Sequence, residues 1–219
     1  MLEKKKTNIG GAAKSLLTPD NCCLLLIDYQ PTGFFTVQSM DRQLLINNIL
    51  GLAKAAKVFH LPTILTTVVA SEFSGPLLPE LRKVFPENMA IDRTGNNPWE
   101  DERIVSAVQK TGRQKIVMAG LWTGNCLALP VLSALEDGYE VYVVADACGD
   151  VSVMAHEMAM QRVIQAGAVP ITWQTMMLEL HRDWARQETA GAVNEVAKEH
   201  GGAQGQAAIY SQKMIQKGK

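Results

Sequence analysis

The chain has 219 residues, of which 47% are hydrophobic and 20% are charged, and its mean hydropathy is zero. This composition predicts a globular chain with one sizeable core and excludes the disordered and fibrous classes. A formal net charge of −1, from 21 basic and 22 acidic residues, provides no positive field for a phosphate backbone or an anionic lipid surface. We therefore expect no nucleic-acid partner and no membrane partner.

The four cysteines and the first residues of the sequence indicate the cellular compartment of the protein. The adjacent pair Cys22 and Cys23 fits neither a disulfide framework nor a C-x-x-C ligand pair, which indicates a reducing compartment. Residues 7–14 lack the apolar stretch of a secretory signal. The uncharged run 116–135 contains polar and helix-breaking residues near its middle, so we predict a strand, a turn and a helix there instead of a membrane span. We predict a cytoplasmic protein.

Strand-like and helix-like patterns alternate in chain order. The continuous apolar run 21–28 predicts a buried parallel strand. Apolar residues three and four positions apart predict a helix over 41–60 with Asp41 as its cap, and β-branched residues predict a strand over 61–69. The later patterns predict helices at 80–85, 100–111, 126–137, 152–166 and 176–186, strands at 89–93, 114–119, 139–145 and 168–173, and pocket-lining loops at 31–38 and 71–79.

This alternation predicts βαβ units with right-handed crossovers. The expected fold class is α/β, a three-layer doubly wound fold whose mostly parallel six-stranded sheet has the order 3-2-1-4-5-6, with helices on both faces. Past Ala190 the composition shifts to Gly, Ala, Gln and Lys, which indicates a segment outside the core. We predict an N-terminal extension (1–16), a core domain (17–188) and a C-terminal extension (189–219) that either packs on a partner subunit or is disordered.

Two candidate catalytic side chains follow the first and fourth predicted strands. Ligands of doubly wound sheets bind beyond the carboxyl ends of the strands, where strand order reverses, and this places Asp28 opposite Cys126. A helix start at Cys126 favours the thiolate and offers N–H groups to an oxyanion, and Asp28 is a candidate general base. The alternatives are a small buried hydrophobe for Cys126 and a cap or turn residue for Asp28.

Other sulfur-containing residues have simpler interpretations. Cys22, Cys23 and Cys148 lie in or beside predicted strands and are expected to be core residues. Met154, Met158 and Met160 are expected to form a packed helix face.

Several motifs resemble one family over about residues 17–186. They are LLIDYQ (25–30), GLWTGNC (120–126), GYEV (138–141) and DA (146–147), and they resemble the isochorismatase-like cysteine hydrolases. RTGNNPW (93–99) and ELHRDW (179–184) are most similar to the YcaC-like branch, whose members are oligomeric hydrolases of poorly defined substrate. The resemblance implies a homo-oligomer.

The resemblance also implies residue roles. Asp28 matches the acid/base and Cys126 the nucleophile, while Arg93 stands where the family usually has a lysine. An arginine stays protonated, so it supplies positive charge but exchanges no proton. The family further implies a non-proline cis peptide, here between Trp122 and Thr123, and an oxyanion hole from the N–H groups of Thr123 and Cys126.

The chain lacks the signals of a metal or nucleotide site. Its four histidines have no ligand spacing, no G-x-G-x-x-G occurs, and residues 10–15 resemble a phosphate loop only superficially because no glycine precedes the lysine. We expect no cofactor and no metal. The expected partner is a small-molecule substrate, in a pocket that includes Gln30, Phe34 and Trp122.

The resulting hypothesis is a metal-independent cysteine hydrolase that cleaves a small amide or related C–N bond through a thioester on Cys126. The alternative is a non-hydrolytic oligomer that binds a small ligand or senses oxidants through the same thiol. A third reading, hydrolysis of a vinyl ether as in isochorismatase, is weaker because that reaction does not need the cysteine. The sequence leaves the substrate open.

Overall fold

The structure is a computed structural model that describes residues 16–217. Residues 1–15, which hold the phosphate-loop-like pattern and nearly all of the predicted N-terminal extension, lie outside the described residues.

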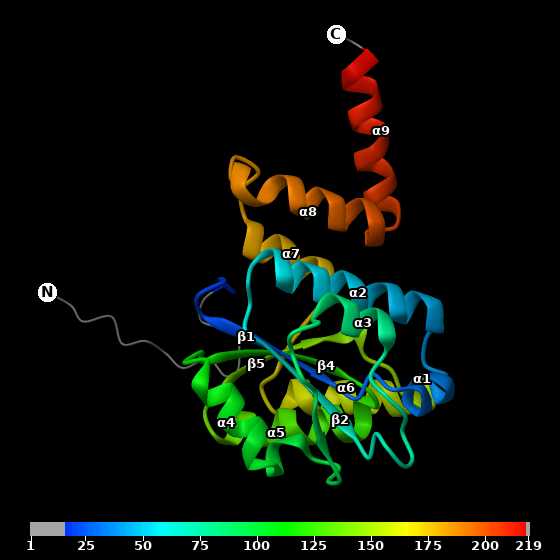
Figure 1. The fold of residues 1–219 in the computed structure, drawn as a ribbon, viewed down its shortest axis with the longest axis vertical. Coiled ribbons are helices and arrows are strands. Elements are labelled where there is room, and N and C mark those ends of the chain that lie inside the picture. Colours follow the sequence, from blue (N-terminus) through cyan, green and yellow to red (C-terminus); the bar gives the residue numbers. More distant parts are fainter. Residues whose placement is uncertain (1–15, 218–219) are drawn as a thin grey trace, which may run out of the picture.

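One six-stranded sheet organises the fold (Figure 1). Every pair of neighbouring strands is parallel, and the order β3-β2-β1-β4-β5-β6 confirms the predicted doubly wound α/β class. The two central strands are buried along their whole length, as their continuous apolar sequences predict. The strands are β1 (Cys22–Ile27), β2 (Thr63–Val68), β3 (Ile91–Arg93), β4 (Lys115–Gly120), β5 (Glu140–Val144) and β6 (Val169–Ile171).

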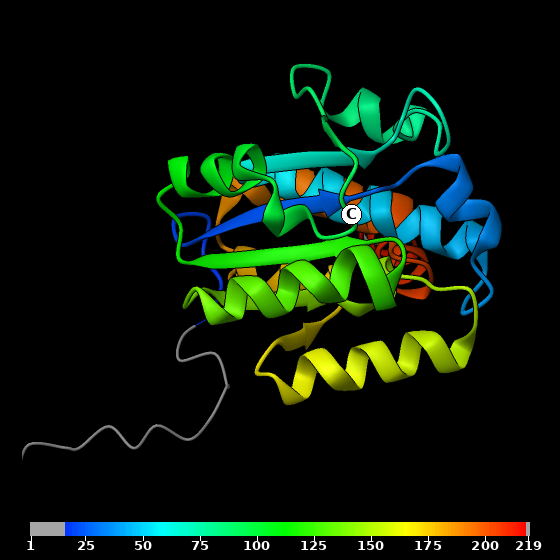
Figure 2. The ribbon, with the colours of Figure 1, turned by 90° about the horizontal axis from the view of Figure 1, so that it is seen from below.

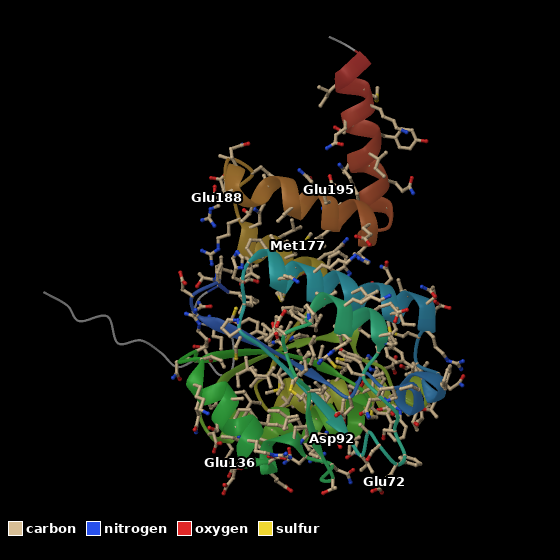
Figure 3. The ribbon with its side chains drawn as sticks, in the orientation of Figure 1. Glu72, Asp92, Glu136, Met177, Glu188 and Glu195 are labelled. Atoms are coloured by element: carbon tan, nitrogen blue, oxygen red, sulfur yellow. The ribbon has the colours of Figure 1, made fainter. Side chains whose placement is uncertain are left out.

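Helices cover both faces of the sheet (Figures 1 and 2). One layer holds α2 (Arg42–Val58), α3 (Pro79–Val84), α7 (Trp173–His181) and α8 (Gln187–His200), and the other holds α4 (Glu102–Lys110), α5 (Ala128–Glu136) and α6 (Val153–Gln165). Met177 of α7, labelled in Figure 3, is fully buried. The sheet is thus closed on both faces, which leaves the ends of its strands as the place for a site.

Local capping explains where helices begin. Asp41 accepts a hydrogen bond from the Leu44 N–H at 2.8 Å, which confirms it as the cap of α2. The helix predicted over 176–186 instead spans Trp173–His181, because Thr172 caps it by accepting from the Thr175 N–H. A further correction concerns 31–38, which was expected to be a loop: it contains the short helix α1 (Pro31–Thr36), with a proline in its first turn.

The segment after Ala190 forms α8 and α9 (Ala203–Lys217). It was expected to lie outside the core, but Val193, Val196 and Ala197 of α8 are buried in the main core cluster, because their helical spacing places them on one face. Glu188 and Glu195 lie exposed on the same helix (Figure 3). By contrast, α9 rests on α8 and extends away from the sheet (Figure 1).

The methionines of α6 differ in their exposure to solvent. The predicted packed methionine face is wrong for Met154 and Met158, which are exposed, whereas Met160 is buried. The reason is that α6 packs through Ala159, Met160 and Val163, which form a narrower stripe.

The uncharged run 116–135 folds as β4, the π-helical turn η2 (Thr123–Leu127) and α5. Within residues 16–217, no helix has the length and apolar character needed to cross a membrane.

Candidate active site

The ends of β1 and β4 bring the predicted catalytic residues together. Ile27 pairs with Gly120, and a Cβ atom on Gly120 would lie only 2.6 Å from the Cβ atom of Ile27. Glycine therefore permits the close approach of these strands. Asp28 directly follows β1, and η2 carries Cys126 shortly after β4. Both residues line one cavity of about 200 Å³.

Asp28 and Arg93 form a buried two-pronged ion pair. Arg93 Nη2 donates to Asp28 Oδ2 at 2.7 Å and Arg93 Nη1 donates to Asp28 Oδ1 at 3.2 Å. The side chains are only 2% and 4% exposed. Nη1 also donates to the Thr67 carbonyl oxygen at 3.3 Å, while Arg93 Nε is buried without a hydrogen-bond partner. The pair fixes the carboxylate in one orientation, as parallel hydrogen bonds to a planar guanidinium do.

Two residues at these strand ends have left-handed backbone conformations. Asp28 has a φ of 55° and Val69, which follows β2, has a φ of 46°. Aspartate tolerates this region, whereas a β-branched residue there is strained. Both residues line the cavity. Strain of this kind concentrates at functional sites, where the surrounding structure enforces it.

The Cys126 thiol is protonated at neutral pH. Burial is the largest cause, and together with the Asp28 charge and hydrogen bond it raises the pKa of Cys126 to about 12 against the lowering effect of Arg93. The expectation that a helix start favours the thiolate is therefore wrong. Cys126 lies inside η2, and α5 begins only at Ala128, so the thiol sits among buried groups beside a carboxylate.

Burial also raises the pKa of Asp28, although Arg93 and the hydrogen bond from Cys126 oppose this rise. Asp28 raises the pKa of Cys126, and the hydrogen bond from Cys126 lowers the pKa of Asp28, so the carboxylate and the thiol behave as one coupled acid–base pair. A proton that leaves Cys126 has an acceptor in direct contact. This arrangement can deliver a thiolate at the moment of attack without storing one.

Neighbouring segments hold η2 in place. The Gly124 N–H donates to Asp150 Oδ2 at 2.7 Å, the Thr123 N–H donates to the Gly149 carbonyl oxygen at 2.9 Å, and Thr123 Oγ1 lies 2.8 Å from His156 Nδ1. The Thr123 N–H is thus already used, which corrects its expected place in the oxyanion hole. The Cys126 N–H makes no hydrogen bond to a described group outside η2.

The cis peptide bond lies between Leu121 and Trp122. It was expected one residue later, between Trp122 and Thr123, so that position is corrected.

Of the three residues predicted to line the pocket, Trp122 and Gln30 line the cavity and Phe34 does not. Trp122 lines the cavity and its Nε1 donates to Thr36 Oγ1 at 2.9 Å. Gln30 also lines it, but its amide is engaged by the backbone of Val68 and Gly75. Phe34 packs against the ring of Tyr29 in the core and does not line the cavity.

Sequence reasoning named part of the lining. The loops 31–38 and 71–79, which were expected to line a pocket, contribute Thr32, Gly33, Phe73 and Ser74. The lining residues that it missed are Val68, Val69, Thr94, Asn96, Leu121 and Asn125. Thr94 and Asn96 belong to the motif RTGNNPW, and Leu121 and Asn125 to GLWTGNC, so the motifs carried a signal for these four. Asp150, which holds η2, had none, because its role depends on a contact with a distant segment.

The remaining cysteines are not part of this site. Cys22, Cys23 and Cys148 are buried in the core cluster, as predicted, and no cysteine forms a disulfide.

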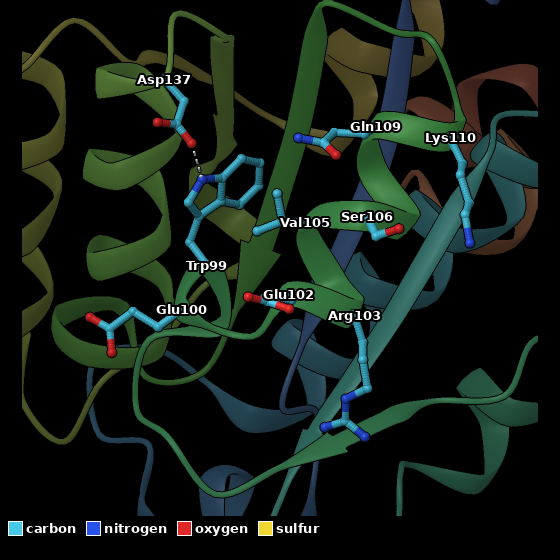
Figure 4. A pocket seen from close by; sticks show the side chains of 9 residues that line it. All are labelled: Trp99, Glu100, Glu102, Arg103, Val105, Ser106, Gln109, Lys110 and Asp137. Carbon is cyan, nitrogen blue, oxygen red and sulfur yellow. Dashed lines mark hydrogen bonds between the residues drawn. The ribbon is translucent and has the colours of Figure 1, made fainter.

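A larger hollow of about 740 Å³ lies over α4 (Figure 4). Charged and polar side chains such as Glu102, Arg103 and Lys110 line it, and Trp99 Nε1 donates to Asp137 Oδ2 at 2.7 Å. It contains neither a thiol nor a buried ion pair, so it lacks the chemistry of the smaller cavity. Within residues 16–217, no group of three or more His, Cys, Asp or Glu residues could hold a metal ion.

Sequence comparisons match this chain to a known domain family and to a bacterial relative. The isochorismatase domain family matches residues 22–175. "Probable hydrolase YcaC" from Escherichia coli is 42% identical over 169 residues, which cover 77% of this chain and 81% of YcaC.

Two solved structures are also similar. The crystal structure of E. coli YcaC, an octameric hydrolase of unknown specificity, superimposes with a TM-score of 0.88 at 35% identity and covers 93% of this chain and 99% of that one. YcaC from Pseudomonas aeruginosa, solved with hexane-2,5-diol and covalent acrylamide, has a TM-score of 0.87 at 35% identity, with coverages of 92% and 99%.

Proposed function

Because this chain belongs to the isochorismatase domain family, we propose that it is a cysteine hydrolase that cleaves a small amide or related C–N bond at Cys126. The observation that carries the proposal is that a thiol and a carboxylate line one cavity, with a buried guanidinium paired to the carboxylate behind it. The nucleophile, a base beside it and a third group that orients the base form the arrangement used in covalent hydrolysis.

In the first half of the reaction, Asp28 accepts the thiol proton as the Cys126 sulfur attacks the carbonyl carbon. The negative charge moves onto the carbonyl oxygen, where the Cys126 N–H and the Asn125 side-chain amide are the candidate donors. When the C–N bond breaks, Asp28 returns the proton to the leaving nitrogen. The products are an amine or ammonia and a thioester on Cys126.

In the second half, Asp28 accepts a proton from a water molecule that attacks the thioester. The C–S bond breaks, the proton passes from Asp28 to the sulfur, and the carboxylic acid leaves. Asp28 therefore acts as base and acid in turn. Arg93 holds the carboxylate in place throughout and exchanges no proton.

The relatives support this proposal at a coarser level. YcaC of E. coli is described as a hydrolase of unknown specificity, and covalent acrylamide in the P. aeruginosa protein fits a reactive site that accepts a small uncharged molecule. Oxidant sensing, the alternative function, is less well supported because thiolates are the form that oxidises readily, and burial keeps this thiol protonated.

The test is to incubate the protein with a panel of small amides and to measure ammonia release. Intact-mass and peptide mass spectrometry then locate any acyl adduct after acid quenching. We expect turnover of at least one amide and an adduct on Cys126. An adduct on another residue, or full activity in Cys126→Ala, would contradict the mechanism, and tight binding without turnover would favour a non-hydrolytic ligand-binding protein.

We further propose that the chain forms a homo-oligomer through α9. Tyr210, Met214 and Ile215 of this helix are each more than half exposed, and α9 extends away from the sheet (Figure 1). Exposed large apolar side chains on a projecting helix favour burial against another subunit. The octameric state of E. coli YcaC supports the same conclusion. The C-terminal extension of the domain is then α9, and not the whole of residues 189–219, because α8 packs into the core.

A further inference from the structure

The walls of the catalytic cavity offer no free positive charge. Among the described residues that line it, Asp28 is the one charged side chain, and its two hydrogen bonds from Arg93 already engage that guanidinium. Arg93 itself does not line the cavity and is 4% exposed. The exposed Arg103, which lines the neighbouring hollow together with Arg93 and Thr94, is engaged by Asp101.

The polar groups that do face the cavity are neutral. Ser74, Thr94, Asn96 and Asn125 line it, and no described group forms a hydrogen bond with any of these four side chains. Ser74 is 6% exposed, so its hydroxyl is enclosed and yet open to a ligand. Hydroxyl and amide groups of this kind bind carbonyl oxygens and amide N–H groups without requiring charge.

The rest of the wall is apolar and the space is small. Val68, Val69, Phe73, Leu121 and Trp122 complete the lining. Drug-sized ligands occupy pockets of roughly 300 to 1,000 Å³, and about 200 Å³ lies below that range. The cavity therefore suits a short apolar group attached to a carbonyl.

We propose that the site selects uncharged small amides with a short apolar acyl group and discriminates against substrates that carry a carboxylate. This inference rests on the proposed function and adds its substrate class. A substrate carboxylate would lose its hydration without gaining a cation and would approach the negative charge of Asp28. Like charges brought together in this way weaken binding strongly.

Matched alkylating reagents test the selectivity without any turnover. Iodoacetamide is neutral and iodoacetate is its anionic counterpart, and both attach to a thiol by displacing iodide. The rate of each reagent at Cys126 is measured by peptide mass spectrometry and divided by its rate with glutathione at the same pH. We expect the normalised rate of iodoacetamide to exceed that of iodoacetate by at least about 10-fold. Equal normalised rates, or no reaction with either reagent, would overturn the inference.

A charge variant sharpens this test. Asn96 is exposed at the cavity lining and has no catalytic role in the proposal, so Asn96→Arg adds a cation and Asn96→Gln is its neutral control. We expect Asn96→Arg to reduce the preference for iodoacetamide several-fold, while Asn96→Gln leaves it unchanged. The same change in both variants would show that charge is not the cause.

Turnover then separates this inference from the proposed function. Butyramide, methyl succinamate and succinamate have similar chains, but only succinamate carries a carboxylate. We expect kcat/KM for the two neutral amides to exceed that for succinamate by at least about 10-fold. Comparable values for all three would overturn the substrate class and leave the hydrolase intact. Absence of turnover together with a strong reagent preference would contradict the hydrolase and leave the selectivity intact.

Discussion

Cys126 and Cys148 lie in two neighbouring regions at the carboxyl ends of the parallel strands, after β4 and β5 respectively. Both thiols are buried, and burial is the largest cause that raises the pKa of each to about 12. Cys126 faces a cavity and contacts Asp28, whereas the Cys148 thiol donates to the Val144 carbonyl oxygen in closed packing. The pKa of the thiol therefore does not distinguish the proposed nucleophile from a core cysteine. A neighbouring carboxylate and an adjoining cavity do.

The largest expected effect comes from replacing each of the two cysteines by alanine in turn. Cys126→Ala should abolish amide hydrolysis, since removing the nucleophile of a hydrolase costs on the order of 10⁶-fold in kcat. Cys148→Ala should keep kcat within a few-fold and lower the free energy of unfolding by about 1 kcal/mol. Steady-state kinetics and urea unfolding measure these effects. Loss of activity in both variants would remove the distinction between the two regions.

Asp28→Asn removes the base and should lower kcat by about 10²- to 10⁴-fold. It also leaves the Arg93 charge buried without its partner, which we expect to cost about 3 to 5 kcal/mol of stability. The double variant Asp28→Asn with Arg93→Gln restores charge balance and should recover part of that stability but none of the activity. Recovery of activity in the double variant would contradict the role of Asp28.

The pH dependence of Cys126 alkylation should move in opposite directions when either charge is removed. The carboxylate raises the pKa of Cys126 and the guanidinium lowers it. Asp28→Asn should therefore shift the profile to lower pH and Arg93→Gln should shift it to higher pH. Because burial is the largest cause, the profile of Asp28→Asn should still lie above that of a free thiol. Shifts in the same direction would mean that the two groups do not act on the thiol through charge.

A smaller effect on kcat is expected when a hydrogen bond that holds η2 in place is weakened. Asp150→Asn weakens the acceptor of the Gly124 N–H, and we expect kcat to fall by up to about 10²-fold through misplacement of Cys126. Asp146→Asn is the matched control, because Asp146 also accepts a backbone N–H, that of Trp173 at 2.9 Å, on a helix away from η2. Comparable kcat losses in both variants would indicate a general effect on stability.

The smallest effect on chemistry is expected from deletion of residues 203–219, which removes α9. Sedimentation should show a smaller assembly than that of the full chain, while alkylation of Cys126 stays within a few-fold. Full-size assembly after the deletion would show that α9 is not the interface. A monomeric full-length chain would contradict the proposal of a homo-oligomer.

The sequence by itself predicted the strand order and the position of the candidate site. Continuous apolar runs identified the central strands, and the rule that ligands bind where strand order reverses placed Asp28 opposite Cys126, which the structure brings to one cavity. Family motifs added Arg93. These inferences succeeded because periodicity and connection rules act along the chain and need no knowledge of distant contacts.

The tertiary structure alone decided the remaining features. The protonation state of Cys126 reflects its burial and the charge of Asp28, and a helix-start argument from local sequence gave the opposite direction. The use of the Thr123 N–H by Gly149, the neutral lining of the cavity and the packing of α8 into the core all join segments far apart in the chain. Desolvation and hydrogen-bond competition depend on such neighbours, so no local pattern encodes them.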